Sequence, residues 1–228
     1  MKKYLIILML VIFFSCKKDN VTVQPTVQAN IPPDKFVTIS GNNVLLLFFK
    51  DTTISNKTWN FNSMHLAAAN LTANQIAFIT DSLQREFNRK GADLLVTTDV
   101  SFYKKALRKQ VAIITKTSAW YNGNYGNENG GTGTCYIGSW MLQAGTPFFV
   151  FPALLGNNSG DVIRTIFHEF GHSVGLYHSK GVYDSKVNYD WMSESSLSFG
   201  FTGYYGNPTI NQSCKLIYEQ DVLIKALQ

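Results

Sequence analysis

The run from His168 to His178 constrains this chain more than any other stretch of it. It reads His-Glu-Phe-Gly-His-Ser-Val-Gly-Leu-Tyr-His and fits the pattern HExxHxxGxxH. Positions i and i+4 of a helix share one face, so His168 and His172 can bind the same ion. The chain has 4 histidines, and the only one outside this run is His65. We interpret His65 as an ordinary loop or surface residue.

The remaining residues of the run predict a catalytic rather than a structural metal site. Gly175 allows a left-handed turn after the helix, and that turn can bring His178 back to the ion. Three neutral imidazoles leave one corner of a zinc tetrahedron open for water. Glu169, next to the first ligand, can then act as a base on that water. The plain alternative is a chance match on an amphipathic helix, which is a better account of HExxH alone than of the longer pattern.

Length and composition predict one folded domain. The chain has 228 residues, of which 45% are apolar and 15% charged, and this excludes a disordered polyelectrolyte. The formal net charge is +5. The charges form no block of one sign, so no nucleic-acid partner is expected. We expect a monomer.

The N-terminal residues predict export. Lys2 and Lys3 precede an apolar run from Tyr4 to Phe14, which is too short to span a bilayer but suits a signal peptide. Phe13-Phe14-Ser15-Cys16 resembles a bacterial lipoprotein signal, which implies lipid on Cys16. This predicts a lipid-anchored protein of the bacterial cell envelope, on the periplasmic or surface face of the outer membrane. A plain secretory signal with an incidental cysteine is the alternative, and the protein would then be secreted.

We therefore divide the chain into three parts. Residues 1–16 are the signal peptide with its lipidation site, residues 17–35 are a flexible tether with Pro25, Pro32 and Pro33, and residues 36–228 are the folded domain. The cysteines outside the signal are Cys135 and Cys214. An exported pair allows a disulfide, although sequence cannot show that the two lie close together.

Hydrophobic periodicity predicts a mixture of strands and helices. The clearest helix begins with a Thr72–Gln75 capping box and carries apolar residues at three- and four-residue steps. A loop with Trp59-Asn60 precedes it. The expected strands are Val44–Phe49, Asp93–Thr98, Gln110–Thr115, an edge strand Cys135–Trp140, and Phe148–Phe151. The expected helices are Ala73–Lys90, the motif helix from about Gly160 with Asp161 or Ser159 as cap, and Lys215–Leu227.

The order of these elements predicts the α+β fold class. We expect a mixed, mostly parallel, twisted sheet with an antiparallel edge strand, packed on two main helices. An irregular C-terminal subdomain with a closing helix would follow.

The motif and the residues around it resemble a known family. His168–His178 followed by Ser179 resembles the metzincin zinc endopeptidases, and the serine is similar to that of matrixins. The resemblance implies one catalytic Zn²⁺ on His168, His172 and His178, with Glu169 as general base. It also implies that Met192 forms the methionine turn beneath the metal.

The upstream half is similar to bacterial reprolysin-like metzincins. It shares their Trp-Asn pair at Trp59-Asn60 and a strand that ends in Val-Thr-Thr-Asp at Val96–Asp99. Gly133–Trp140 resembles the edge strand on which these enzymes bind protein or peptide substrates. This resemblance implies substrate contacts for Thr134, Cys135, Tyr136, Ile137 and Gly138. Lys50 departs from the acidic or small residue of those relatives, and Ca²⁺ is not indicated.

The expected function is hydrolysis of peptide bonds in proteins by a zinc-dependent endopeptidase. Two other functions remain open. One is a non-catalytic surface lipoprotein that binds its partners on the same scaffold, although the intact Glu169 argues against it. The other is a zinc amidase acting on envelope material.

Overall fold

A mixed β-sheet forms the centre of the domain. The computed structural model describes residues 36–119, 131–142, 145–176, 192, 208–210 and 216–228. Within these residues the sheet order is β4-β1-β5-β7-β6, parallel from β4 to β7, with β6 antiparallel at the edge. The strands are β1 (Asn43–Phe48), β4 (Leu95–Thr97), β5 (Arg108–Ile114), β6 (Gly133–Thr134) and β7 (Phe148–Val150). The predicted mostly parallel sheet with an antiparallel edge strand is confirmed.

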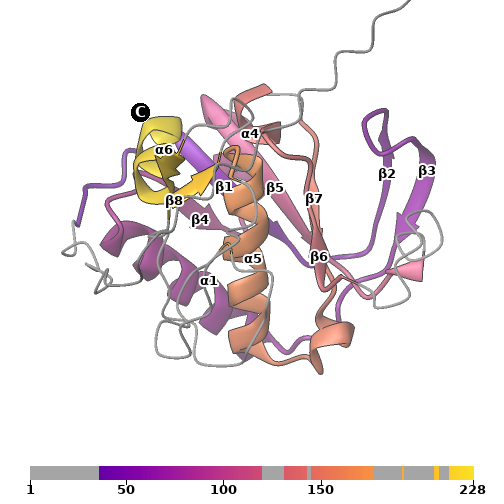
Figure 1. Cartoon of the computed structure of the whole chain (residues 1–228). Coiled ribbons are helices and arrows are strands. Elements are labelled where there is room, and N and C mark those ends of the chain that lie inside the picture. Colours follow the sequence, from indigo (N-terminus) through magenta and orange to yellow (C-terminus); the bar gives the residue numbers. More distant parts are fainter. Residues whose placement is uncertain (1–35, 120–130, 143–144, 177–191, 193–207, 211–215) are drawn as a thin grey trace, which may run out of the picture.

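The two main helices cover one face of this sheet (Figure 1). Helix α1 (Ala73–Arg89) begins with the predicted capping box, since Thr72 and Gln75 exchange side-chain and backbone hydrogen bonds. Helix α5 (Ser159–Ser173) carries the histidine motif. The Phe87 ring of α1 lies against the rings of Phe167 and Phe170 of α5, with centroids 4.4 and 5.1 Å apart. These buried aromatic contacts hold α5 against α1.

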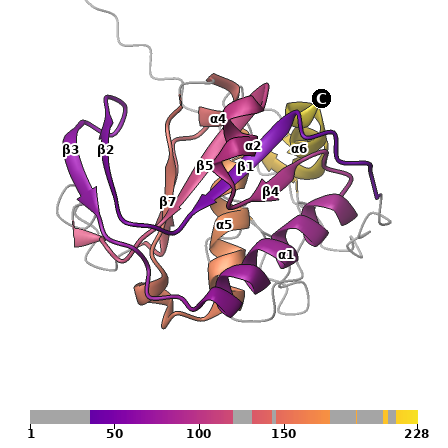
Figure 2. The same cartoon turned by 180° about the vertical axis from the view of Figure 1, so that it is seen from behind.

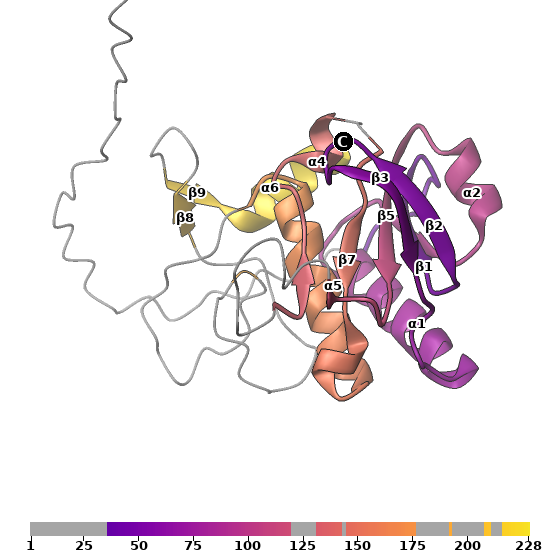
Figure 3. The ribbon, with the colours of Figure 1, turned by 90° about the vertical axis from the view of Figure 1, so that its right-hand side faces the viewer.

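A hairpin of β2 (Thr52–Asn56) and β3 (Phe61–Leu66) occupies the opposite face, together with the short helix α2 (Val100–Lys105) (Figures 2 and 3). We predicted a loop for this hairpin, and that prediction is wrong. Trp59 in the hairpin turn is 6% exposed and donates its indole N–H to the Pro147 carbonyl over 2.8 Å. Its ring packs edge-on against Phe149 of β7, so the hairpin buries the second face of the sheet.

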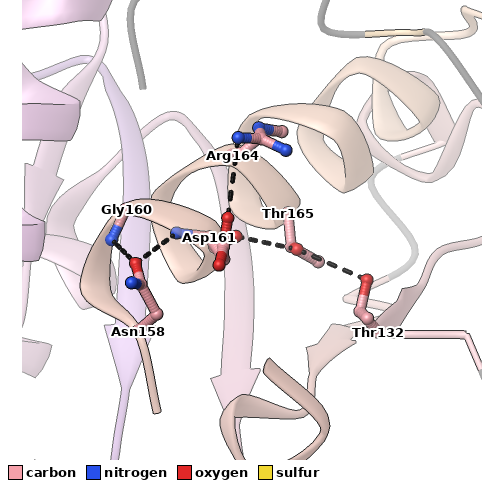
Figure 4. A network of polar contacts seen from close by, with 6 residues as sticks. All are labelled: Thr132, Asn158, Gly160, Asp161, Arg164 and Thr165. Carbon is pink, nitrogen blue, oxygen red and sulfur yellow. Dashed lines mark hydrogen bonds and ion pairs between the residues drawn. The ribbon is translucent and has the colours of Figure 1, made fainter. Parts of the chain in front are cut away.

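Two boundary predictions near the motif helix are corrected. The cap of α5 is Asn158, not Asp161 or Ser159, because its side-chain oxygen accepts from the backbone N–H groups of Gly160 and Asp161 (Figure 4). The predicted edge strand Cys135–Trp140 is also wrong. The strand is β6 at Gly133–Thr134, and α4 (Ser139–Leu142) follows.

The C-terminal part contains a strand that we did not predict, and its helix therefore begins later than expected. Strand β9 (Leu216–Tyr218) pairs with β8 (Pro208–Ile210), and α6 (Glu219–Leu227) follows, where we predicted a helix from Lys215. A 3-10 turn (Pro152–Leu155) precedes α5. None of the helices in the described residues is long and apolar enough to cross a membrane. The predicted signal, tether and Cys16 lie outside the described residues.

Candidate metal centre

Helix α5 brings His168 and His172 together at one point. The two Nε2 atoms lie 3.1 Å apart, and the rings are nearly perpendicular at 88°. Two nitrogens bound to one tetrahedral zinc at 2.0–2.1 Å are separated by about 3.3 Å. The observed separation therefore fits two ligands of a single ion, as the i, i+4 spacing predicts.

A backbone carbonyl fixes the orientation of the His172 ring. Its Nδ1 lies 2.7 Å from the Leu176 carbonyl oxygen, which can only accept a hydrogen bond. Nδ1 must therefore carry the proton, and in the neutral ring Nε2 keeps its lone pair. That lone pair points at Nε2 of His168, and two facing lone pairs repel unless a proton or a cation lies between them. The donor set thus fits a cation.

The turn after α5 has the geometry that the glycine predicts. Gly175 has φ +102°, a conformation that a side chain with a Cβ resists. The Leu176 N–H donates to the Gly171 carbonyl and the Gly175 N–H to the His172 carbonyl, which is a Schellman motif. The motif places the Leu176 carbonyl against the His172 ring. His178, the predicted third ligand, lies outside the described residues and stays a prediction.

Glu169 is a buried carboxyl group whose charge nothing in the described structure balances. It is 4% exposed, and its Oε2 atom has no hydrogen-bond partner. Loss of solvent around the group raises its pKa to about 8. A carboxyl group that binds a proton near neutral pH is suited to accept and return protons. A buried oxygen without a described partner, on the residue that follows His168, also fits the general base predicted from the sequence.

One of the predicted substrate residues lies against this end of α5. The Gly138 N–H donates to the His172 carbonyl over 2.8 Å, which fixes the loop after β6 to the helix. Tyr136 and Ile137 are 36% and 39% exposed, and the Tyr136 hydroxyl donates to the Thr58 carbonyl of the hairpin turn. Gly138 thus lies against the motif helix, whereas Tyr136 contacts Thr58 and Trp59 of the hairpin turn. The contact of the predicted residues with substrate stays a prediction.

Cys135 is a free cysteine in this structure, and Cys214 lies outside the described residues. The structure therefore gives no support to the bridge that the sequence allowed. Burial of the thiol raises the pKa of Cys135 well above its ordinary value. The Glu169 charge raises it further, and a contact with Ser139 opposes both. A thiol with a raised pKa carries little thiolate at neutral pH.

Met192 is fully buried and belongs to the same apolar cluster as Phe170 and Val174 of the α5 region. Its flanking residues lie outside the described part of the chain, so its role in a turn stays a prediction. Among the described residues, no group of three or more His, Cys, Asp or Glu side chains could hold a metal. The described centre thus comprises His168, His172 and Glu169.

One residue of the centre was not identified from the sequence. Gly133 of β6 lies so close to Glu169 that a Cβ would be 2.8 Å from the carboxyl oxygen Oε1. The available signal was a glycine within a strand, which often marks close backbone approach.

Comparison with known proteins gives little. No family model matches the chain, and no curated protein matches it. Among solved structures, it is similar to the crystal structure of archaemetzincin from Methanopyrus kandleri, at 14% sequence identity. The match covers 71% of this chain and 86% of that chain, with a TM-score of 0.36. A likeness this slight carries no argument about function.

Proposed function

We propose that the protein is a zinc-dependent endopeptidase of the metzincin type. The observation that carries the proposal is the pair of histidine Nε2 atoms 3.1 Å apart on α5, together with the buried Oε2 of Glu169, which has no hydrogen-bond partner among the described residues. His168 and His172 would hold Zn²⁺, with His178 as the third ligand that the sequence motif predicts. The pattern leaves no role for Glu169 as a ligand and makes it available for proton transfer.

In the proposed reaction, His168 and His172 would hold Zn²⁺, which would supply Lewis acidity toward a water molecule and the scissile carbonyl. Glu169 accepts the proton of that water and returns it to the leaving amine. In the protein without metal, burial raises the pKa of Glu169. His172 is held for its role by the Leu176 carbonyl.

The substrate would bind as an extended peptide along β6. This strand is at the edge of the sheet and pairs with β7 on its inner side. An exposed edge can accept one more strand through backbone hydrogen bonds. The loop Cys135–Gly138 would then contact side chains of the peptide, with Tyr136 and Ile137 offering apolar surface.

The decisive experiment compares the parent chain with Glu169→Gln. We expect the parent to contain zinc and to cleave casein or a peptide library, with activity lost to a chelator and restored by Zn²⁺. Glu169→Gln should keep the zinc and lower kcat by about 10²–10⁴-fold. Glu86→Gln is a matched control, since Glu86 is equally buried on α1 and should leave kcat unchanged. A Glu169→Gln protein that cleaves like the parent contradicts the assignment, and a parent that cleaves only cell-wall amides favours the amidase.

We also propose that the domain is anchored by lipid on Cys16. The support is the sequence pattern of the first residues alone. Labelled fatty acid should enter the parent chain in bacterial cells and fail to enter Cys16→Ser. A parent chain that takes up no label contradicts the anchor and leaves the secreted form.

A further inference from the structure

We propose that Gly133 is a positioning residue that holds the Glu169 carboxyl directly beneath the edge strand. This inference rests on the proposed function. A Cβ built on Gly133 would lie 2.8 Å from Oε1 and 2.9 Å from Cγ of Glu169, and 2.7 Å from Cγ2 of Thr165. Real Cβ atoms essentially never approach other atoms so closely. Glycine is required here for space, because its φ is not in the left-handed region.

Other glycines near the site serve a different purpose. Gly138 and Gly175 have φ values of +79° and +102°, and a Cβ on either would meet no atom of the described residues within 4 Å. They are required for backbone conformation. Gly133 is the reverse case, in which the backbone is ordinary and the neighbouring side chains fill the space. Its function is therefore to bring β6 into contact with α5.

Neither neighbour of Gly133 can move aside easily. Thr165 is β-branched, donates its hydroxyl to the Asp161 carbonyl over 2.9 Å and lies 3.5 Å from the Thr132 hydroxyl (Figure 4). Glu169 is 4% exposed and surrounded by protein. The position of β6 thus determines the space available to the side chains of Thr165 and Glu169.

The strand itself is held on both sides of Gly133. The Phe151 N–H donates to the Thr132 carbonyl over 2.9 Å, just before Gly133. The Gly138 N–H donates to the His172 carbonyl over 2.8 Å, just after β6. Because these bonds tie β6 to β7 and to α5, the separation of Gly133 and Glu169 is fixed. Glu169 accordingly lies beneath the strand along which the peptide would bind.

A methyl group at this position should displace the carboxyl from the scissile bond. For Gly133→Ala we expect zinc content and KM close to those of the parent, and kcat lower by about 10²-fold, the loss typical of a misplacement near 1 Å. Gly160→Ala is the matched control. It adds a methyl to the first turn of α5, where the nearest atom is the Asn158 side-chain oxygen at 3.2 Å. Its kcat should equal that of the parent.

Thr165→Ser separates positioning from simple packing. This change removes Cγ2, the closest of the three contacts, and keeps the hydroxyl. Added to Gly133→Ala, it should raise the urea midpoint of the metal-free protein, while kcat stays low because the contacts with Glu169 remain. Recovery of both quantities would mean that Gly133 only fits the strand to the helix, and the inference would be wrong.

A second readout needs no turnover. In the metal-free protein, Glu169→Asp should lower the urea midpoint less in the Gly133→Ala background than in the parent, because the shorter side chain withdraws from the methyl group. Strict additivity of the two changes would overturn the contact. If the parent shows no zinc-dependent cleavage, the proposed function is wrong, and so is the role of Gly133 in catalysis. The urea measurements still report the contact between Gly133 and Glu169 in that case. If the parent cleaves peptides and Gly133→Ala keeps the full kcat, only the positioning role of Gly133 is wrong.

Discussion

Helices α1 and α5 are built alike and differ at one buried carboxyl group. Glu86 of α1 is 6% exposed and Glu169 of α5 is 4% exposed. Glu86 is bound by the guanidinium of Arg89, one turn further on, through two hydrogen bonds. Glu169 has an oxygen with no partner among the described residues. Leaving a buried carboxyl unpaired is unfavourable, so its retention on α5 points to chemistry rather than stability.

Helices α1 and α5 also begin and end in the same way. Each begins with a side-chain cap, Thr72 on α1 and Asn158 on α5. Each ends in a Schellman motif with a glycine, Gly91 with φ +79° and Gly175 with φ +102°. Because the framework is common to both, the comparison isolates the effect of the groups that α5 places near its C-terminal end.

The sharpest test of the difference is the pH dependence of unfolding of the metal-free protein. The folded-state pKa of Glu169 is about 8, above the ordinary value of 4.5. Between these values the unfolded chain has released the proton and the folded chain has not, so the unfolding free energy falls as pH rises and levels off above about pH 8. We expect a fall of up to about 5 kcal/mol in the parent.

Urea denaturation at several pH values measures this fall. Glu169→Gln should remove most of the slope, because the amide does not titrate, while Glu86→Gln should keep it. If the parent has the same unfolding free energy at pH 5 and pH 8, Glu169 has a partner that balances its charge.

Removing the partner of Glu86 should make α1 resemble α5. Arg89→Ala leaves the Glu86 carboxyl buried without its guanidinium, and we expect a loss of about 2–3 kcal/mol in unfolding free energy at pH 7. The kcat for peptide cleavage should not change, because α1 contributes no residue to the centre. Urea denaturation and a peptide assay measure the two quantities.

The double change Glu86→Gln with Arg89→Ala is the control for this pair. It should be less destabilising than Arg89→Ala alone, since no buried charge is left. A loss within about 0.5 kcal/mol for Arg89→Ala would show that the pair behaves like an exposed ion pair.

Part of the framework common to both helices could be predicted from sequence, because its signals are local, but the Asn158 cap of α5 was not predicted. The Thr72–Gln75 capping box and the apolar run of β1 each lie within a few residues. The i, i+4 spacing of His168 and His172 and the turn at Gly175 were predicted for the same reason.

What sequence did not predict depends on residues far apart in the chain. Strand β2 has one apolar residue, Ile54, so its pairing with β3 was not visible as a pattern. The hairpin buries Trp59, Phe61 and Leu66 against the sheet, which is a contact between distant parts of the chain. Strand β6 is too short to have a periodicity. The unpartnered state of Glu169 and its contact with Gly133 exist only once β6 and α5 are assembled.

Substitution of the glycines that end α1 and α5 should give the smallest change in unfolding free energy. It also separates stability from metal binding. Gly91→Ala and Gly175→Ala should each lower the unfolding free energy of the metal-free protein by about 1 kcal/mol, because both place a Cβ at positive φ. Only Gly175→Ala should weaken zinc binding, by about tenfold, because its turn holds the Leu176 carbonyl that orients the His172 ring. Urea denaturation and a competitive zinc titration measure these changes. Equal zinc affinity in the two variants would mean that the turn after α5, like the turn after α1, only ends a helix.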